Sequence, residues 1–176
     1  MADFSAVPAG SASCRTPLGW VRVQVRAGAI CAVALEERRP VREGAENGLA
    51  RRACEAIQQW LEGGEWPRDL PLSPFGTDFQ LRVWSELLKI PPGRCLTYAE
   101  LAQRLGSGAR AVGGACRANP MPLLVPCHRV VAANGLGGFA GQRQGRWLEI
   151  KRWLLEHEGI AKNRGSLKTS DPPLRR

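Results

Sequence analysis

Apolar and polar residues alternate in the first part of the chain, with the period of two that is typical of β-strands. One run covers residues 18–25 and a second covers residues 29–35, with Gly28 between them, so together they predict a β-hairpin. Over residues 45–62 the apolar positions recur every three or four residues, which predicts a helix that ends at a glycine pair. Residues 70–72 are a candidate third strand at the edge.

After residue 76 the apolar positions keep the helical spacing. Thr77 or Asp78 is predicted to cap a helix that runs to Lys89, and a last helix is predicted over residues 147–157.

Between these two helices the sequence predicts a pair of short ones. Thr97 and Glu100 form a capping box that opens a helix to Leu105. A second helix is predicted over residues 109–118, after a turn that contains two glycines. Two short helices about such a turn are typical of a helix-turn-helix.

These elements predict an α+β protein. A small N-terminal module, a β-hairpin or three-stranded sheet plus a helix, precedes a mainly helical C-terminal domain with a helix-turn-helix. The expected parts are a disordered N-terminus over residues 1–13, an N-terminal domain over 14–75, a second domain over 76–159 and a basic disordered tail over 160–176. The sequence has no run of 18 apolar residues and no secretory signal, so no membrane segment is expected.

Charge is distributed unevenly along the 176 residues, whose formal net charge is +9. Residues 1–76 carry equal numbers of basic and acidic side chains, whereas residues 77–147 carry nine basic and three acidic ones. A basic second half suggests a polyanionic partner, although a solvated basic surface is an equal alternative on charge alone.

The cysteines and histidines argue against a metal site. None of the six cysteines forms a C-x-x-C pair, and the chain has only two histidines, so no zinc-finger spacing occurs. Scattered cysteines in a chain without a secretory signal indicate a reducing compartment, and we therefore expect a cytoplasmic protein, or a nuclear one in a eukaryote.

The strongest chemical signal is the hexapeptide PCHRVV at residues 126–131. Cys127 is followed directly by His128, and Glu158 lies near the end of the last predicted helix. A thiol becomes a strong nucleophile only as a thiolate, so it needs a nearby base or a positive field. Cys127, His128 and Glu158 can supply the nucleophile, the base and an orienting carboxylate. Taken alone, Cys127 and His128 are more often structural residues.

Two segments around the hexapeptide have unusual composition. The helix over residues 109–118 is built of small residues, and only Arg110 and Arg117 project from it, which suits a narrow groove and weak sequence preference. Residues 134–146 are rich in glycine and can press their backbone against a flat ligand. The alternatives are a tightly packed core helix and an ordinary flexible connection.

These motifs resemble those of the O6-alkylguanine-DNA alkyltransferases, a family of single-turnover DNA-repair proteins. The resemblance rests on PCHRVV, on RAVGGACRANP at residues 110–120, on GGFAG at 137–141 and on KRWLLEHEG at 151–159. It covers residues 76–159 densely and residues 14–75 loosely.

The resemblance implies irreversible transfer of an alkyl group from guanine O6, or from thymine O4, to Cys127. His128 then takes the thiol proton through a water, Glu158 orients His128, Tyr98 donates at guanine N3, and Asn119 holds the turn that leads to an extended strand carrying Cys127. It implies no cofactor and no metal.

The resemblance also implies duplex DNA with an O6-alkylguanine as the partner, no membrane partner, and rotation of the damaged nucleotide out of the stack. Arg110 fills the vacated space and Arg117 contacts phosphate. The carbonyls of Cys127 and Val130 accept from the exocyclic amine, and the Ala140 N–H serves O6. The implied DNA-binding residues are Arg110, Gly113, Ala115, Arg117, Pro122, Val130, Phe139 and Ala140. We expect a monomer, associated with the nucleoid in a bacterium, and cooperative binding on DNA is left open.

The sequence departs from the family at Phe139, where tyrosine is common, and at Gln142, where glycine is frequent. Three alternatives remain. An inert alkyltransferase-like lesion binder is disfavoured by Cys127, a helix-turn-helix regulator is disfavoured by the slim helix, and a cysteine hydrolase has no recognisable oxyanion site.

Overall fold

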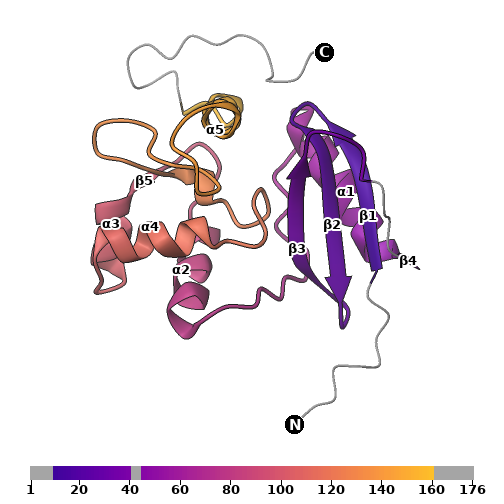
Figure 1. The fold of residues 1–176 in the computed structure, drawn as a ribbon, viewed down its shortest axis with the longest axis horizontal. Helices are drawn as coiled ribbons and strands as arrows, with labels where there is room; N and C mark the ends of the chain where they lie inside the picture. Colours follow the sequence, from indigo (N-terminus) through magenta and orange to yellow (C-terminus); the bar gives the residue numbers. More distant parts are fainter. Residues whose placement is uncertain (1–9, 41–44, 161–176) are drawn as a thin grey trace. The chain divides into compact units, whose positions relative to one another are not determined.

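The computed structural model describes residues 10–40 and 45–160. The chain divides into two compact units between Phe75 and Gly76 (Figure 1). The predicted disorder of residues 1–9 and of the tail beyond Ile160 lies outside the described residues.

The first unit contains a four-stranded sheet with the order β3-β2-β1-β4. Its strands are β1 (Gly10–Thr16), β2 (Gly19–Arg26), β3 (Ala29–Glu36) and β4 (Ala45–Glu46). β2 pairs antiparallel with β1 and β3, and β4 pairs parallel with β1. The prediction of disorder was therefore wrong for residues 10–13, because these small polar residues pair with β2 from Gly10 onward.

The helix α1 (Gly48–Leu61) packs on this sheet, mainly against β1. It begins three residues later than predicted, because the Asn47 side chain caps it by accepting from the backbone N–H groups of Leu49 and Ala50. The core of the unit lies between the helix and one face of the sheet. Its fully buried side chains include Val21, Val23, Ile30, Ala50, Ala53 and Ile57.

The second unit is mainly helical (Figure 1). It contains α2 (Asp78–Leu88), α3 (Tyr98–Arg104), α4 (Ala109–Arg117) and α5 (Arg146–His157), with the two-residue strands β5 (Leu96–Thr97) and β6 (Val130–Val131) paired in parallel. Capping boxes of Thr77 with Gln80 and of Thr97 with Glu100 start α2 and α3. The predicted helix-turn-helix is confirmed as α3 and α4, which pack on each other.

The helix α4 has one buried face and one exposed face. Val112, Ala115 and Cys116 are buried, and the indole N–H of Trp84 in α2 donates to the Ala115 carbonyl at 2.9 Å. Arg110 and Arg117 project from the exposed face. The small residues therefore allow α4 to pack closely on α2, while the role of its exposed face in a DNA groove stays a prediction.

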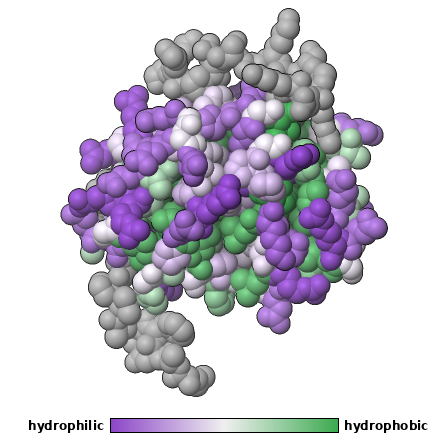
Figure 2. Space-filling view, turned by 180° about the vertical axis from the view of Figure 1, so that it is seen from behind, coloured by the Kyte–Doolittle hydropathy of each residue, from purple (hydrophilic) through white to green (hydrophobic). Residues whose placement is uncertain are grey.

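Most large apolar side chains of the described chain are buried, and only Phe75, Leu81 and Leu88 are exposed. On the face shown in Figure 2, hydrophilic side chains cover much of the surface and hydrophobic ones form patches between them. No helix within residues 10–40 and 45–160 is both long enough and apolar enough to span a membrane.

Candidate active site

Cys127 lies in a tight turn. Residues Cys127–Arg129 form a single 3-10 turn, in which the N–H of Arg129 donates to the Pro126 carbonyl at 3.0 Å. The expectation that Cys127 sits in an extended strand was wrong. Pro126 bends the chain with φ −80° and ψ 62°, and the β-branched pair begins the strand only at Val130.

Asn119 ties the end of α4 to this turn. Its side-chain Nδ2 donates to the Val125 carbonyl at 2.9 Å and to the Cys127 Sγ at 3.2 Å, and its Oδ1 accepts from the N–H of Met121 at 3.0 Å. A donor aimed at sulfur stabilises a thiolate more than a thiol. Asn119 therefore both fixes the turn and favours the ionised form of Cys127.

Glu158 holds the two residues that follow Cys127. One carboxylate oxygen lies 3.1 Å from the Nε2 of His128. The Arg129 guanidinium donates to both carboxylate oxygens, at 2.7 to 3.1 Å, and to the Ile90 carbonyl at 2.5 Å. His128, Arg129 and Glu158 have almost no exposed side-chain surface, so they form a buried, charge-assisted cluster.

This cluster sets the protonation states of its members. Burial alone would raise the pKa of Glu158, but hydrogen bonds from His128 and Arg129 lower it to about 2. Burial lowers the pKa of His128, against the opposing effect of Glu158. At neutral pH the carboxylate is therefore ionised and the imidazole is neutral, which is the form that can accept a proton.

A buried lysine completes the polar interior of the site. The Nζ of Lys151 in α5 donates to the Val130 carbonyl at 2.6 Å and to the Gly138 carbonyl at 2.9 Å. It also lies 5.7 Å from the centroid of the Tyr98 ring. Burial lowers the pKa of Lys151 to about 8, so it stays largely cationic at neutral pH.

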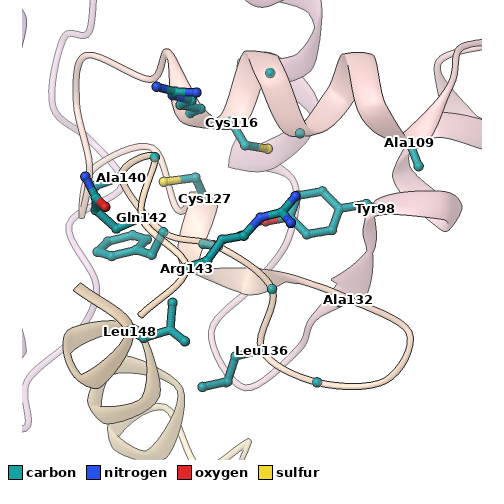
Figure 3. A pocket seen from close by; sticks show the side chains of 18 of the residues that line it. Tyr98, Ala109, Cys116, Cys127, Ala132, Leu136, Ala140, Gln142, Arg143 and Leu148 are labelled. Carbon is teal, nitrogen blue, oxygen red and sulfur yellow. The ribbon is translucent and has the colours of Figure 1, made fainter. Parts of the chain in front are cut away.

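The thiol of Cys127 opens into a cavity of about 1040 Å³ (Figure 3). The walls come from Tyr98, from the exposed face of α4 and from the glycine-rich loop over residues 134–143. Four arginines line the cavity, and no aspartate or glutamate of the described chain does so; they are Arg110, Arg117, Arg143 and Arg152. The cavity is therefore suited to an anionic ligand that presents a small reactive group to the thiol.

The glycine-rich loop presses against the ring of Tyr98. A side chain at Gly137 would place its Cβ 2.8 Å from the Tyr98 ring, and Gly137 has a φ of +70°. The Tyr98 hydroxyl donates to the Gly138 carbonyl at 3.3 Å. Glycine is thus required here for both space and backbone conformation.

A tight turn at Ala140 and Gly141 closes the far end of this loop. Phe139 and Gln142 exchange backbone hydrogen bonds at 2.9 Å, while Ala140 and Gly141 have φ values of +47° and +80°. This is the pattern of a two-residue type I′ turn. The N–H of Ala140 has no recorded partner within the described chain, so it can donate to a ligand. Gly141 lies against the Arg117 side chain, since a Cβ there would be 3.0 Å from Nε.

Burial raises the pKa of the Cys127 thiol, and Asn119 and Lys151 lower it again only in part. The raised pKa means that Cys127 rests as a protonated thiol. The site therefore needs a base at the moment of reaction.

The structure brings most of the predicted site residues to the cavity: Tyr98, Arg110, Gly113, Arg117, Cys127, Phe139 and Ala140 line it. The other predicted site residues do not line the cavity. Asn119 donates a hydrogen bond to the Cys127 sulfur, and His128 is bonded to Glu158.

Three residues predicted to bind DNA do not line the cavity. The Ala115 side chain is buried because α4 turns that face toward Trp84. The Val130 side chain is fully buried, and its carbonyl already accepts from Lys151. Pro122 is half-buried outside the lining. Ala115 and Pro122 remain predicted DNA contacts.

Arg129 and Lys151 were missed as functional residues. Arg129 stands inside the hexapeptide itself. Lys151 could have been found, because it falls four residues after Trp147 and three before Leu154, within the apolar stripe of the last helix. A lysine in an apolar stripe is expected to be buried, and a buried lysine almost always has polar partners, so its position indicates a polar site in the interior.

Comparison with known sequences points to one family. Residues 78–160 match the model described as 6-O-methylguanine DNA methyltransferase, DNA binding domain. The chain is 43% identical over 150 residues to a Thermus thermophilus protein named DNA base-flipping protein, covering 82% of this chain and 96% of that protein. It is 46% identical over 91 residues to the methylated-DNA–protein-cysteine methyltransferase of Metallosphaera sedula, covering 52% of this chain. That match spans 55% of the relative's length.

Comparison with solved structures gives the same result over most of the chain. Mycobacterium tuberculosis O6-methylguanine methyltransferase is similar with a TM-score of 0.74 at 30% identity, covering 90% of this chain and 96% of that chain. M. tuberculosis OGT in complex with DNA gives a TM-score of 0.73 at 31% identity, covering 85% and 92% of the two chains.

Proposed function

Because the chain belongs to the 6-O-methylguanine DNA methyltransferase family, we propose that it repairs DNA by irreversible, single-turnover transfer of an alkyl group to Cys127. The substrate is O6-alkylguanine in duplex DNA, and O4-alkylthymine is a second substrate. One observation carries the proposal: the Cys127 thiol opens into an arginine-lined cavity, and the residues that follow it in the chain, His128 and Arg129, are held in a buried cluster with Glu158.

The transfer begins with loss of the thiol proton. Neutral His128 accepts it through a bridging water, and the carboxylate of Glu158 stabilises the imidazolium that results. Arg129 keeps Glu158 ionised and in place. The Asn119 amide and the charge of Lys151 stabilise the thiolate while it attacks the alkyl carbon in a single displacement.

The leaving group is guanine, which departs as an anion unless it is protonated. We place the extruded base in the cavity between Tyr98 and the glycine-rich loop. The Tyr98 hydroxyl, which burial keeps protonated by raising its pKa, turns from the Gly138 carbonyl to donate at N3, and Gly138 keeps its bond from Lys151. The Ala140 N–H donates at O6. The carbonyls of Cys127 and Val130 accept from the exocyclic amine, since a carbonyl that already bonds Lys151 has a second lone pair.

The protein acts on a base that a duplex hides, so the nucleotide must leave the stack. Arg110, on the exposed face of α4 at the rim of the cavity, fills the vacated space, while Arg117 contacts the phosphate backbone. We further propose that the chain acts as a monomer.

The experiment that tests this function is intact-mass analysis after incubation with a duplex containing O6-methylguanine. We expect the mass to rise by one methyl group per molecule and no further, with the methyl on the peptide that contains Cys127. Repeated turnover by one molecule, or an unchanged mass, would contradict the proposal.

Arg110→Ala is expected to slow repair of the duplex roughly tenfold or more, because unstacking a base costs a few kcal/mol and nothing then fills the gap. Transfer from free O6-benzylguanine, which needs no extrusion, should change much less. The matched control is Arg104→Ala, an exposed arginine of α3 that does not line the cavity. Equal losses on duplex and free base would remove the stacking role of Arg110.

Phe139→Tyr is expected to change the methyl-transfer rate less than tenfold, since one neutral hydrogen bond contributes about 0.5–1.5 kcal/mol. Phe139→Ala should cost clearly more, because the ring packs against Trp147 with centroids 6.2 Å apart and forms part of the cavity wall. Single-turnover rates, measured with thermal unfolding of each variant, provide the check. A hundredfold gain with tyrosine would mean that a different lesion is preferred.

A second candidate function is recognition of the lesion without transfer. The observation in its favour is the similarity over 82% of the chain to the T. thermophilus protein named DNA base-flipping protein. The intact-mass experiment separates the two, because a pure binder takes up no methyl group while it retains affinity for the alkylated duplex.

A further inference from the structure

A second thiol lies in the same cavity as Cys127, and the proposed transfer does not use it. Cys116, in the last turns of α4, lines the cavity although its exposed fraction is only 6%. No hydrogen bond of its Sγ is recorded within the described residues. Figure 3 shows Cys116 reaching from α4 and Cys127 from the turn below it, both at the cavity.

Cys116 and Cys127 are close enough to influence each other. The pKa of Cys116 is raised to about 12, mainly by burial and next by electrostatic repulsion from the neighbouring Cys127 sulfur. Both thiols also raise the pKa of Tyr98. Asn119 lies three residues after Cys116 and donates a hydrogen bond to the Cys127 sulfur. The short segment between the two cysteines is therefore fixed at Asn119.

We propose that Cys116 is a second acceptor, which captures bifunctional lesions as a bridge between Cys116 and Cys127. The substrate class is an O6-(2-haloethyl)guanine, which carries a leaving group on the second carbon of its alkyl chain. This inference rests on the proposed transfer to Cys127.

The first step is the ordinary transfer. The Cys127 sulfur attacks the carbon bound to O6, the carbon–oxygen bond breaks, and guanine keeps the electron pair and takes a proton. Cys127 is then an S-(2-chloroethyl) thioether. Its sulfur displaces the chloride from the neighbouring carbon, and chloride leaves with its electron pair. The product is a three-membered episulfonium ion.

Cys116 completes the reaction by opening that ring. Its sulfur attacks one ring carbon, the bond from that carbon to Cys127 breaks, and the electron pair returns to the Cys127 sulfur. The Cys116 proton passes to water. The product is a chain of sulfur, two methylene groups and sulfur, which joins the two residues after net loss of hydrogen chloride.

The raised pKa of Cys116 does not prevent this step. A thiol with a pKa of about 12 is ionised in roughly one molecule in 10⁵ at pH 7. Well-oriented neighbouring groups react with effective concentrations of about 10⁵–10⁸ M, which offsets that fraction. An alkylated Cys127 cannot become a thiolate, so it no longer opposes ionisation of Cys116, whereas Lys151 still favours the Cys116 thiolate.

The geometric demand is looser than for a disulfide. A disulfide requires Cβ atoms about 3.5–4.5 Å apart. Two extra methylene groups lengthen the link, so a bridge can join two thiols that are too far apart for a disulfide.

The test uses the full chain and a duplex containing O6-(2-chloroethyl)guanine, followed by intact-mass analysis and peptide mapping. We expect the mass of most of the alkylated protein to rise by C2H4 minus the two thiol hydrogens. The Cys116 and Cys127 peptides should be joined by a covalent link. Cys116→Ser should instead carry a single-ended hydroxyethyl or chloroethyl group on Cys127. Cys95→Ser is the matched control, because Cys95 does not line the cavity, and it should still form the bridge.

A single-ended adduct on wild-type protein would overturn this inference, as would a protein–DNA cross-link as the main product. Transfer from O6-methylguanine, measured in parallel, shows which idea has failed. Methyl uptake without a bridge leaves the proposed function standing, whereas no uptake from either lesion removes both.

Discussion

Cys127→Ser is expected to abolish methyl uptake from O6-methylguanine DNA, which is the largest effect anticipated for a single substitution. A serine hydroxyl stays protonated at any pH at which the protein is folded, and it is a far weaker nucleophile than a thiolate. The buried cluster behind the residue can assist loss of a thiol proton but cannot generate an alkoxide. Intact-mass analysis at equal protein and lesion concentrations measures the loss directly.

Binding should survive removal of the thiol. Cys127→Ala keeps the slim face of α4 and the four cavity arginines, so it should still bind the alkylated duplex, with affinity that falls as salt rises. Methyl found on Cys116 in Cys127→Ser would contradict the assignment of Cys127 as the first acceptor. Loss of binding in Cys127→Ala would mean that the thiol itself contributes to recognition.

Glu158→Gln is expected to slow transfer roughly 10²–10⁴-fold, the range that a positioned acid–base group contributes. The amide cannot stabilise the imidazolium of His128, and it offers one acceptor oxygen where the carboxylate serves His128 and Arg129 with two. Single-turnover rates against pH measure the effect. Glu158→Asp, which keeps the charge, should recover part of the rate, and Glu149→Gln, at an exposed site of α5, is the matched control.

The same substitution should lower stability, because it leaves the buried Arg129 without its counter-charge. Breaking one partner of a buried ion pair typically costs about 3–5 kcal/mol. The carboxylate of Glu158 has a pKa of about 2, below its ordinary value of 4.5. Its contribution to stability is therefore complete above pH 4.5 and is lost as the pH falls toward 2. Glu158→Gln should remove that part of the acid sensitivity. A normal transfer rate in a folded Glu158→Gln protein would show that His128 acts without this partner.

Sequence patterns predicted the helices best where local chemistry decides the outcome. Thr77 and Thr97 cap their helices through side-chain hydrogen bonds that depend only on neighbouring residues. The strand β1 was not predicted at all, because Gly10–Thr16 consists mainly of small and polar residues, and its partner β2 supplies the pairing. The Cys127 turn was mistaken for a strand because the Val130–Val131 pair follows it directly.

Motifs brought together the residues of the site, but not all of their partners. The contact between His128 and Glu158 agrees with the implied pairing. The hydrogen bonds from Arg129 to Glu158 were not predicted. They depend on the path of the backbone that brings Arg129 beside Glu158, and this path cannot be read from composition. Lys151 meets the carbonyls of Val130 and Gly138 only after the loop folds back on α5, so its role is a product of tertiary packing.

The bond between His128 and Glu158 spans thirty residues of sequence, and this spacing has a consequence for biosynthesis. A domain can fold on the ribosome once its last essential residue has emerged, and residues are added at about 5–20 per second. The sheet unit closes with residues before Gly76 and can form early. The cluster of His128, Arg129 and Glu158 cannot form until Glu158 has been synthesised. A nascent chain therefore contains the Cys127 thiol for several seconds before this cluster exists.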